Sequence, residues 1–132
     1  MPHIFPLRVY YEDTDLAGIV YYANYLKFIE RARTEYVREL GVDQSALKRD
    51  TGLVFAVRRV EADYFQPAIF DDVLTVETSV EAATGARFVM LQQVKRGETV
   101  LFSAHVTLVA LNLNTGNPAR IPADIRQLLL CD

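Results

Sequence analysis

Apolar and polar residues follow two periodicities along this chain, and the change from one to the other predicts its first elements. Residues 7–12 alternate with a period of two, which is typical of a short strand. From about Ala23 to Leu40 the apolar residues recur at steps of three and four, and the opposite face is charged, which predicts one amphipathic helix. Gly41 is a natural residue to end that helix.

Strand patterns dominate the chain after Gly52. Four strands are predicted, over residues 53–65, 73–80, 87–94 and 100–111. A hairpin turn at Arg96 and Gly97 separates the last two. The final strand is nearly continuous in apolar residues, so we expect it to be central and buried on both faces. A short helix from residue 122 or 123 to residue 130 is predicted to follow.

The order of these elements predicts the fold class. One long helix follows a first strand, and about four antiparallel strands follow the helix. A curved antiparallel sheet of about five strands, wrapped around the helix, would bury the apolar surfaces of both. The predicted class is therefore α+β, and a length of 132 residues suits one domain, residues 1–132.

Composition and charge exclude several kinds of protein. The formal net charge of −3 offers no general positive field for nucleic acid. A single cysteine, Cys131, excludes a disulfide framework and a cysteine-rich zinc site. The first residues lack the features of a signal peptide, and every apolar run is too short to span a membrane. We therefore expect a cytoplasmic globular domain without an integral membrane segment.

An acidic cluster stands directly before an apolar, aromatic run in YYEDTDLAGIVYYANY, residues 10–25. A calcium loop would match Asp13, Asp15 and Gly18, but Ala17 and Asn24 then stand where oxygen ligands are needed. No metal site is therefore predicted.

Two interpretations of Asp15 stay open at this point. It would be stabilised as a helix cap if the long helix began early, although Asn24 is a nearer capping residue. Alternatively, acyl-transfer chemistry needs a carboxylate as base or nucleophile, with N–H donors for the oxyanion. In that case Gly18 lets a ligand approach the backbone closely. Water would be excluded by the apolar residues that follow, Ile19, Val20 and Tyr21.

Other catalytic arrangements find little support in the sequence. There is no Gly-x-Ser-x-Gly elbow, phosphate-binding loop or dinucleotide fingerprint. His3 lies near the terminus, and His105 in the middle of a predicted strand is expected to be structural. Arg58 and Arg59 should point to opposite faces of their strand, so one of them is a candidate to meet a ligand phosphate.

Two segments resemble a known family. The first is Arg8–Gly41, RVYYEDTDLAGIVYYANYLKFIERARTEYVRELG, and the second is Phe55–Asp72, FAVRRVEADYFQPAIFDD. Both resemble the hotdog-fold acyl-CoA thioesterases of the 4-hydroxybenzoyl-CoA thioesterase family, and most of all the branch associated with the Tol-Pal system of Gram-negative bacteria. The resemblance implies a helix wrapped by a sheet. It also implies a homodimer or homotetramer with active sites between subunits.

The resemblance also implies roles for individual residues. The family's catalytic aspartate falls on Asp15, as base or nucleophile, and its carbonyl-polarising backbone N–H falls at about Tyr22. In the Tol-Pal branch a histidine often stands where this chain has Tyr22; backbone donation survives that change. Thr78 or Ser79 is a further candidate to reach the site from a strand.

The implied activity is hydrolysis of an acyl-CoA, or its acyl-carrier-protein counterpart, to a free acid and a thiol. Coenzyme A is the leaving group, so no further cofactor is needed. Its phosphates should meet basic residues, for which the candidates are Arg58, Arg59 and Arg87.

Two alternatives to hydrolysis are kept. A hotdog hydratase or dehydratase would act on the same thioesters without cleaving them. That chemistry usually needs a histidine beside an acid, and His105 is the only internal one. The other alternative is a non-catalytic protein that binds acyl thioesters or serves as a scaffold.

Overall fold

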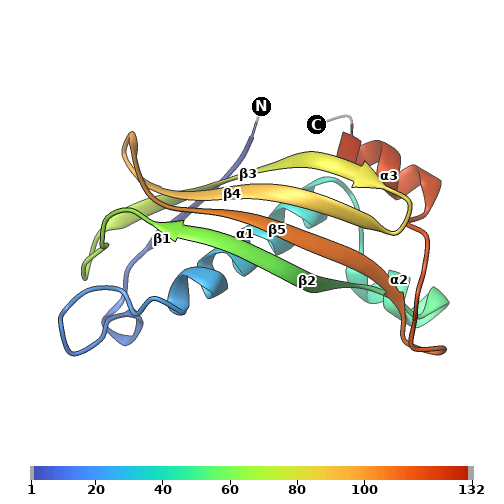
Figure 1. Ribbon diagram of the computed structural model, residues 1–132, viewed down its shortest axis with the longest axis horizontal. Coiled ribbons are helices and arrows are strands. Elements are labelled where there is room, and N and C mark those ends of the chain that lie inside the picture. The colour runs from blue at the N-terminus through green and yellow to red at the C-terminus, as the bar shows by residue number, and fades with distance from the viewer. Residues whose placement is uncertain (1, 131–132) are drawn as a thin grey trace.

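The computed structural model describes residues 2–130 and contains one curved antiparallel sheet that lies across a long helix (Figure 1). The strands are β1 (His3–Arg8), β2 (Leu53–Tyr64), β3 (Val73–Thr84), β4 (Arg87–Arg96), β5 (Thr99–Asn112) and the short β6 (Asn117–Pro118). Their order in the sheet is β1-β3-β4-β5-β2, and β6 pairs with β5. The helices are α1 (Asn24–Glu39), α2 (Gln44–Thr51) and α3 (Ala123–Leu130), and a 3-10 turn covers Tyr11–Asp13. The predicted α+β class, with a long helix against about five strands, is confirmed.

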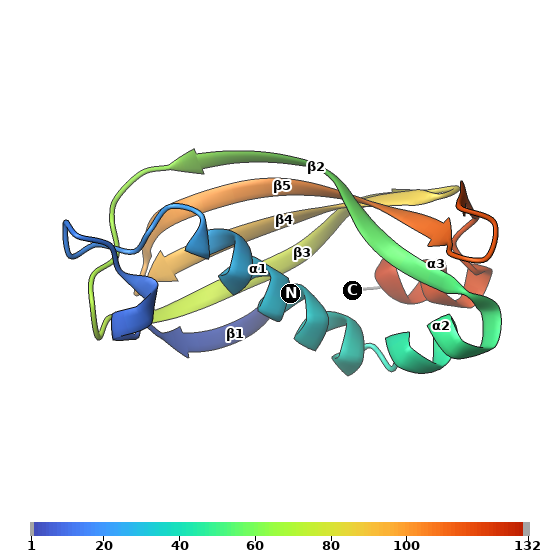
Figure 2. The ribbon, with the colours of Figure 1, turned by 90° about the horizontal axis from the view of Figure 1, so that it is seen from below.

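Helix α1 runs along the concave side of the sheet because its apolar stripe and the inner face of the sheet bury each other (Figure 2). The sheet contributes alternate residues of three neighbouring strands, among them Leu74, Met90 and Val106, which are fully buried. The buried residues of α1 are Tyr25, Phe28, Ile29, Ala32, Tyr36 and Val37.

A polar cluster interrupts this apolar layer. Gln92 is fully buried, and its amide nitrogen donates to the carbonyl oxygen of Ile29 at 2.9 Å and to the hydroxyl of Thr78 at 3.0 Å. Its amide oxygen accepts a hydrogen bond from Arg33 at 3.0 Å. Every polar atom of Gln92 is therefore paired, and the side chain ties the middle of α1 to the sheet. Thr78, which the sequence offered as a site residue, is fully buried in this cluster.

The structure corrects the predicted elements in four places. The first strand, predicted over residues 7–12, is β1 at His3–Arg8, and Tyr11–Asp13 form a 3-10 turn instead. The hairpin turn lies at residues 97 and 98, one position later than predicted, because β4 continues to Arg96 and β5 begins at Thr99.

Helix α2 was not predicted, because it has eight residues and only Leu47 packs against the core. Its ends nevertheless carry the usual signals: the Asp43 carboxylate accepts from the Ala46 N–H at 3.0 Å, and Gly52 closes it at a φ of 75°. Strand β3 continues to Thr84, beyond the predicted end at Val80, because a bulge between Val80 and Ala82 shifts the alternation.

Strand β5 is central, as predicted, but it is not buried on both faces. Its inner residues are buried, whereas on the outer face the His105 side chain is 51% exposed. Within residues 2–130 no helix is long and apolar enough to cross a membrane. Cys131 lies outside the described residues.

Candidate functional site

The acids of the loop before α1 have different surroundings. The carboxylate of Asp13 accepts the N–H of Tyr10 at 2.8 Å. Its carbonyl oxygen accepts the N–H of Tyr21 and the side-chain amide of Asn24, both at 2.9 Å. Asp13 therefore holds the loop against the start of the helix, while the neighbouring Glu12 is exposed.

Asp15 lies at the start of a tight turn. Its N–H donates to the carbonyl of Ile19, and its own carbonyl accepts the N–H of Gly18, both at 2.9 Å. Gly18 has a φ of 82°, a left-handed conformation that costs other residues roughly 1 kcal/mol or more. One carboxylate oxygen, Oδ1, accepts the N–H of Ala17 at 2.9 Å. Within residues 2–130 the other oxygen has no hydrogen-bond or ion-pair partner, so this exposed carboxylate is available for chemistry.

The alternative in which Asp15 caps the long helix is wrong. Helix α1 begins at Asn24, the capping position is Ala23, and no side chain of residues 2–130 makes a capping hydrogen bond there. Asn24 is not the cap either, because it is the first helical residue and donates to Asp13 instead.

The two residues directly before α1 present free backbone donors. Among the described residues 2–130, the N–H groups of Tyr22 and Ala23 make no hydrogen bond. Each N–H shares a peptide group with the carbonyl of the preceding residue, and both of those carbonyls are held by a hydrogen bond. The Tyr21 carbonyl accepts the Asn24 N–H at 2.8 Å, and the Tyr22 carbonyl accepts the Tyr64 hydroxyl at 2.9 Å. Fixed N–H groups at the positive end of a helix are suited to stabilise negative charge.

An aromatic cluster supports this end of the helix. The ring of Tyr64 lies 6.3 Å from Tyr22, 5.5 Å from Tyr25 and 4.9 Å from Phe102, centroid to centroid. Burial raises the pKa of both Tyr25 and Tyr64, so the Tyr64 hydroxyl keeps its proton and donates at neutral pH. The Tyr25 hydroxyl accepts the Ala68 N–H at 3.1 Å.

The apolar run after Gly18 is divided between core and surface. Val20 is 3% exposed, and its N–H donates to the Ala68 carbonyl at 2.9 Å, so it packs in the core. Tyr21 and Tyr22 are exposed, and Ile19 is half-buried. The structure thus leaves Tyr21 and Tyr22 at the surface and holds Ile19 against the Asp15 backbone, whereas Val20 points inward.

The candidate arginines lie elsewhere in the chain. Arg58 and Arg87 line one open cavity of about 560 Å³ at the turn between β3 and β4. That turn and the loop of Asp15 are at opposite ends of the molecule (Figure 1). The predicted alternation of Arg58 and Arg59 is interrupted by a bulge between Val57 and Arg59. Arg59 itself forms an ion pair with Glu61 at 3.4 Å.

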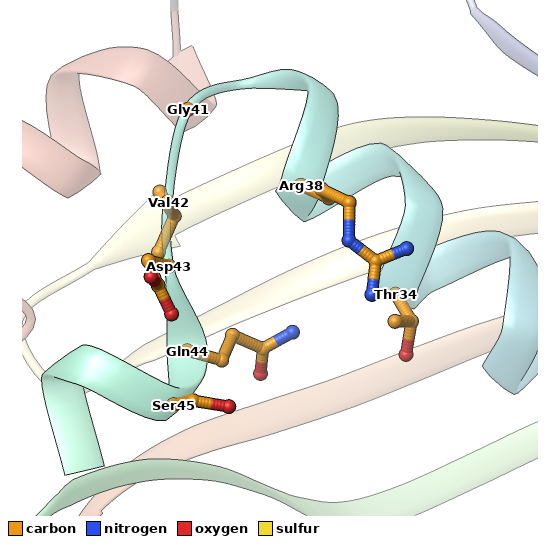
Figure 3. Close-up of a pocket in the computed structure, with 7 residues that line it drawn as sticks. All are labelled: Thr34, Arg38, Gly41, Val42, Asp43, Gln44 and Ser45. Atoms are coloured by element: carbon orange, nitrogen blue, oxygen red, sulfur yellow. The ribbon is translucent and has the colours of Figure 1, made fainter. Parts of the chain in front are cut away.

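Two further features lie away from the Asp15 loop. The Nδ1 atom of His105 lies 2.6 Å from the carboxylate of Glu81 on the outer face of the sheet, because the neighbours of His105 in β5, Ala104 and Val106, point into the core. A cavity of about 620 Å³ lies between the end of α1 and the start of α2 (Figure 3). There Arg38 pairs with Glu35, and the Asp43 carboxylate caps α2. These charged groups are already paired, so this larger cavity is a weaker candidate than the Asp15 loop.

Tyr64 was missed by the sequence analysis. It closes a strand, where an aromatic residue is ordinary, and its partner Tyr22 lies 42 residues away. Its one available signal was its position inside the second segment that resembles the thioesterase family.

A long helix lying across a curved antiparallel sheet of this strand order defines a hotdog-fold protein. Comparison with known proteins agrees with this class. Residues 9–129 match the sequence model of the Thioesterase-like superfamily, and the chain belongs to that superfamily. The class of enzyme predicted from the sequence, a thioester hydrolase, is thereby confirmed at the level of the family.

Relatives match along nearly their whole length. The acyl-CoA thioesterase YbgC of Haemophilus influenzae is 42% identical over 122 residues, which are 92% of this chain and 90% of that protein. The acyl-CoA thioester hydrolase YbgC of Escherichia coli O157:H7 is 39% identical over 121 residues, or 91% of this chain and 90% of the relative. The crystal structure of a probable thioesterase from Bartonella henselae superposes with a TM-score of 0.87 at 39% identity. That match covers 92% of this chain and all of the other.

Proposed function

We propose that the protein is an acyl-CoA thioesterase that hydrolyses its substrate to a free acid and CoA, with Asp15 as the base or nucleophile. The observation that carries the proposal is the exposed Asp15 carboxylate, with one oxygen free, on the loop that leads to two unpaired N–H groups at the start of α1. The names of the relatives, acyl-CoA thioesterase and acyl-CoA thioester hydrolase, support the substrate class.

The chemistry assigns a task to each group. The thioester carbonyl would accept the N–H of Tyr22 together with that of Ala23, and one donor of this kind is typically worth ~10²–10³ in rate. The free oxygen of Asp15 would either attack the carbonyl carbon or take a proton from an attacking water. If Asp15 attacks, the carbon–sulfur bond breaks and an acyl–Asp15 anhydride forms, which water then hydrolyses to the free acid and the Asp15 carboxylate. If water attacks, its oxygen enters the free acid directly as the carbon–sulfur bond breaks. In both cases the CoA sulfur leaves as a thiolate and is protonated.

The phosphates of CoA require a second subunit in this proposal. Arg58 and Arg87 line a cavity at the β3–β4 turn, at the opposite end of the molecule from the Asp15 loop (Figure 1), so in this proposal they hold a CoA molecule that reacts at another subunit. In a homodimer or homotetramer, the arginines of one subunit would face the Asp15 loop of another. The assembly, the phosphate contacts and the cytoplasmic location remain predictions.

The activity is tested by thiol release from a panel of short, long and aromatic acyl-CoAs. Hydrolysis of some members of the panel, with release of one free thiol per acid, is the expected result. Turnover of enoyl-CoAs without free thiol would instead indicate a hydratase. Binding of acyl-CoA by the folded protein with no turnover of either kind would indicate the non-catalytic alternative.

Tyr64→Phe tests the oxyanion part of the proposal. The substitution removes only the hydroxyl that holds the Tyr22 carbonyl, which belongs to the same peptide group as the Ala23 N–H. With that donor less firmly held, we expect kcat to fall roughly three- to tenfold, about 1 kcal/mol, with KM little changed. The carbonyl stretching frequency of an acyl-CoA bound to the Asp15→Asn protein gives a second readout. It should shift toward its value in water when Tyr64→Phe is added.

Tyr25→Phe is the matched control for that experiment. Its hydroxyl serves Ala68 and does not touch the Tyr22 carbonyl, so its loss should lower stability without lowering kcat. Equal effects of the two variants on kcat would mean that Tyr64 acts only as a packing residue.

A further inference from the structure

A third cavity lies between α1 and the β2 side of the sheet, and it differs from the other two in its lining. It has a volume of about 270 Å³, and side chains from α1, α2, β2, β4 and β5 enclose it. The sheet side is apolar, with Phe55, Phe88 and Leu108 among its walls. The α1 side carries Glu30, Arg33 and Thr34. The cavity is thus an apolar chamber with polar groups along one side.

Arg33 is the notable polar group of this cavity. It is half-buried, and its one hydrogen bond goes to the neutral amide of Gln92 at 3.0 Å. Among residues 2–130 it forms no ion pair, and the Glu30 carboxylate accepts the Thr34 hydroxyl instead. Burial lowers the pKa of Arg33, and the field of Glu30 partly opposes that shift. An arginine stays protonated under such conditions.

A protonated guanidinium that forms no ion pair in a largely apolar cavity is stabilised when an anion binds to it. The Glu30 carboxylate lines the same cavity and acts on Arg33 through its field, which weakens the attraction of Arg33 for a second anion. Four of the five N–H groups of Arg33 have no protein partner among the described residues. The planar fork of arginine matches the two oxygens of a carboxylate. The apolar walls suit a hydrocarbon body. A volume of 270 Å³ holds roughly nine groups of the size of a water molecule, about 30 Å³ each.

We propose that this cavity binds a carboxylate on an apolar body, with the Arg33 guanidinium as its anion-binding group. Two sources share this chemistry: a free carboxylic acid, and an acyl-CoA whose acyl group ends in a second carboxylate. The first source does not depend on the proposed thioesterase function, whereas the second rests on it. Arg33 is nine residues into α1, roughly 14 Å along the axis from Asn24, so only a long acyl group would reach it from the helix start.

Binding of octanoate, measured by titration calorimetry on the full chain, tests the site itself. We expect wild type to bind octanoate at least tenfold more tightly than octanamide, which has the same shape without the charge. Arg33→Met should abolish that preference, and Arg33→Lys should keep part of it. Arg38→Met, a change on the same helix of an exposed arginine that pairs with Glu35, should leave it intact.

The comparison of octanoate with octanamide needs no substitution, so it decides the matter even if the Arg33 variants fold poorly. Equal binding of the two compounds to wild type, or no binding of either, would overturn the proposal. So would an unchanged preference in a folded Arg33→Met protein.

Hydrolysis then separates the two sources. If substrates use the cavity, kcat/KM should be higher for long acyl-CoAs with a terminal carboxylate than for methyl-ended ones of equal length. Arg33→Met should then reduce the ratio of these two kcat/KM values at least tenfold. An unchanged ratio together with lost octanoate binding assigns the site to free acids. If no acyl-CoA is hydrolysed, the proposed function fails, while the octanoate result still stands on its own.

Discussion

Asp15→Asn is expected to lower kcat for acyl-CoA hydrolysis by a factor of at least about 100, a loss of about 2.7 kcal/mol of transition-state stabilisation. The amide of asparagine is neutral, so it neither takes a proton from water nor attacks a carbonyl carbon effectively. The loop should survive the change, because the side-chain oxygen of asparagine still accepts the Ala17 N–H. The measurement is thiol release by both proteins, with circular dichroism and thermal unfolding to show that the fold is retained.

Glu12→Gln is the matched control, since it removes the charge of another exposed carboxylate, three residues before Asp15. It should leave kcat within about twofold of wild type, because general electrostatic effects of exposed charges are small. If Asp15→Asn and Glu12→Gln behave alike, the chemistry belongs to another residue. Asp13 would be a poor control, because its carboxylate holds Tyr10 and its removal would disturb the loop.

Periodicity predicted the long elements of the fold because those elements bury one face regularly. The stripe of α1 and the inner faces of β3, β4 and β5 repeat over enough residues to be visible in one sequence. Helix α2 is too short to show a stripe. The bulges near Arg58 and Glu81 insert one residue each into a strand, and that reverses the alternation of everything beyond them.

The candidate site likewise has one part that could be predicted from the sequence and another that could not. Asp15, Gly18 and the start of α1 are close together in sequence, so their joint use could be predicted from one short stretch. Tyr64 and Gln92 donate hydrogen bonds to the carbonyls of Tyr22 and Ile29, which are 42 and 63 residues away in the sequence. Only the folded sheet brings these partners together. The same holds for Arg58 and Arg87, which share a cavity with each other but lie far from Asp15.

Gln92→Ala is expected to cost about 3 kcal/mol of unfolding free energy, the largest stability effect that we predict. The substitution leaves a cavity under α1 and removes the hydrogen-bond partner of the buried Thr78 hydroxyl and of Arg33. For a domain of this size the midpoint of thermal unfolding should fall by roughly 10 °C. Urea unfolding, followed by circular dichroism, measures the free energy directly.

Gln93→Ala provides the comparison, because the next residue of β4 points to the other face of the sheet. Gln93 is half-buried there and makes one long hydrogen bond, 3.3 Å, to Ser103, so its loss should cost less than about 1 kcal/mol. Gln92→Met, which nearly keeps the volume, separates the two parts of the effect. If Gln92→Met is as stable as wild type, the polar cluster contributes nothing, and apolar packing alone sets the position of α1. A loss of about 2 kcal/mol in Gln92→Met would instead assign most of the effect to the hydrogen bonds that connect Ile29, Thr78 and Arg33.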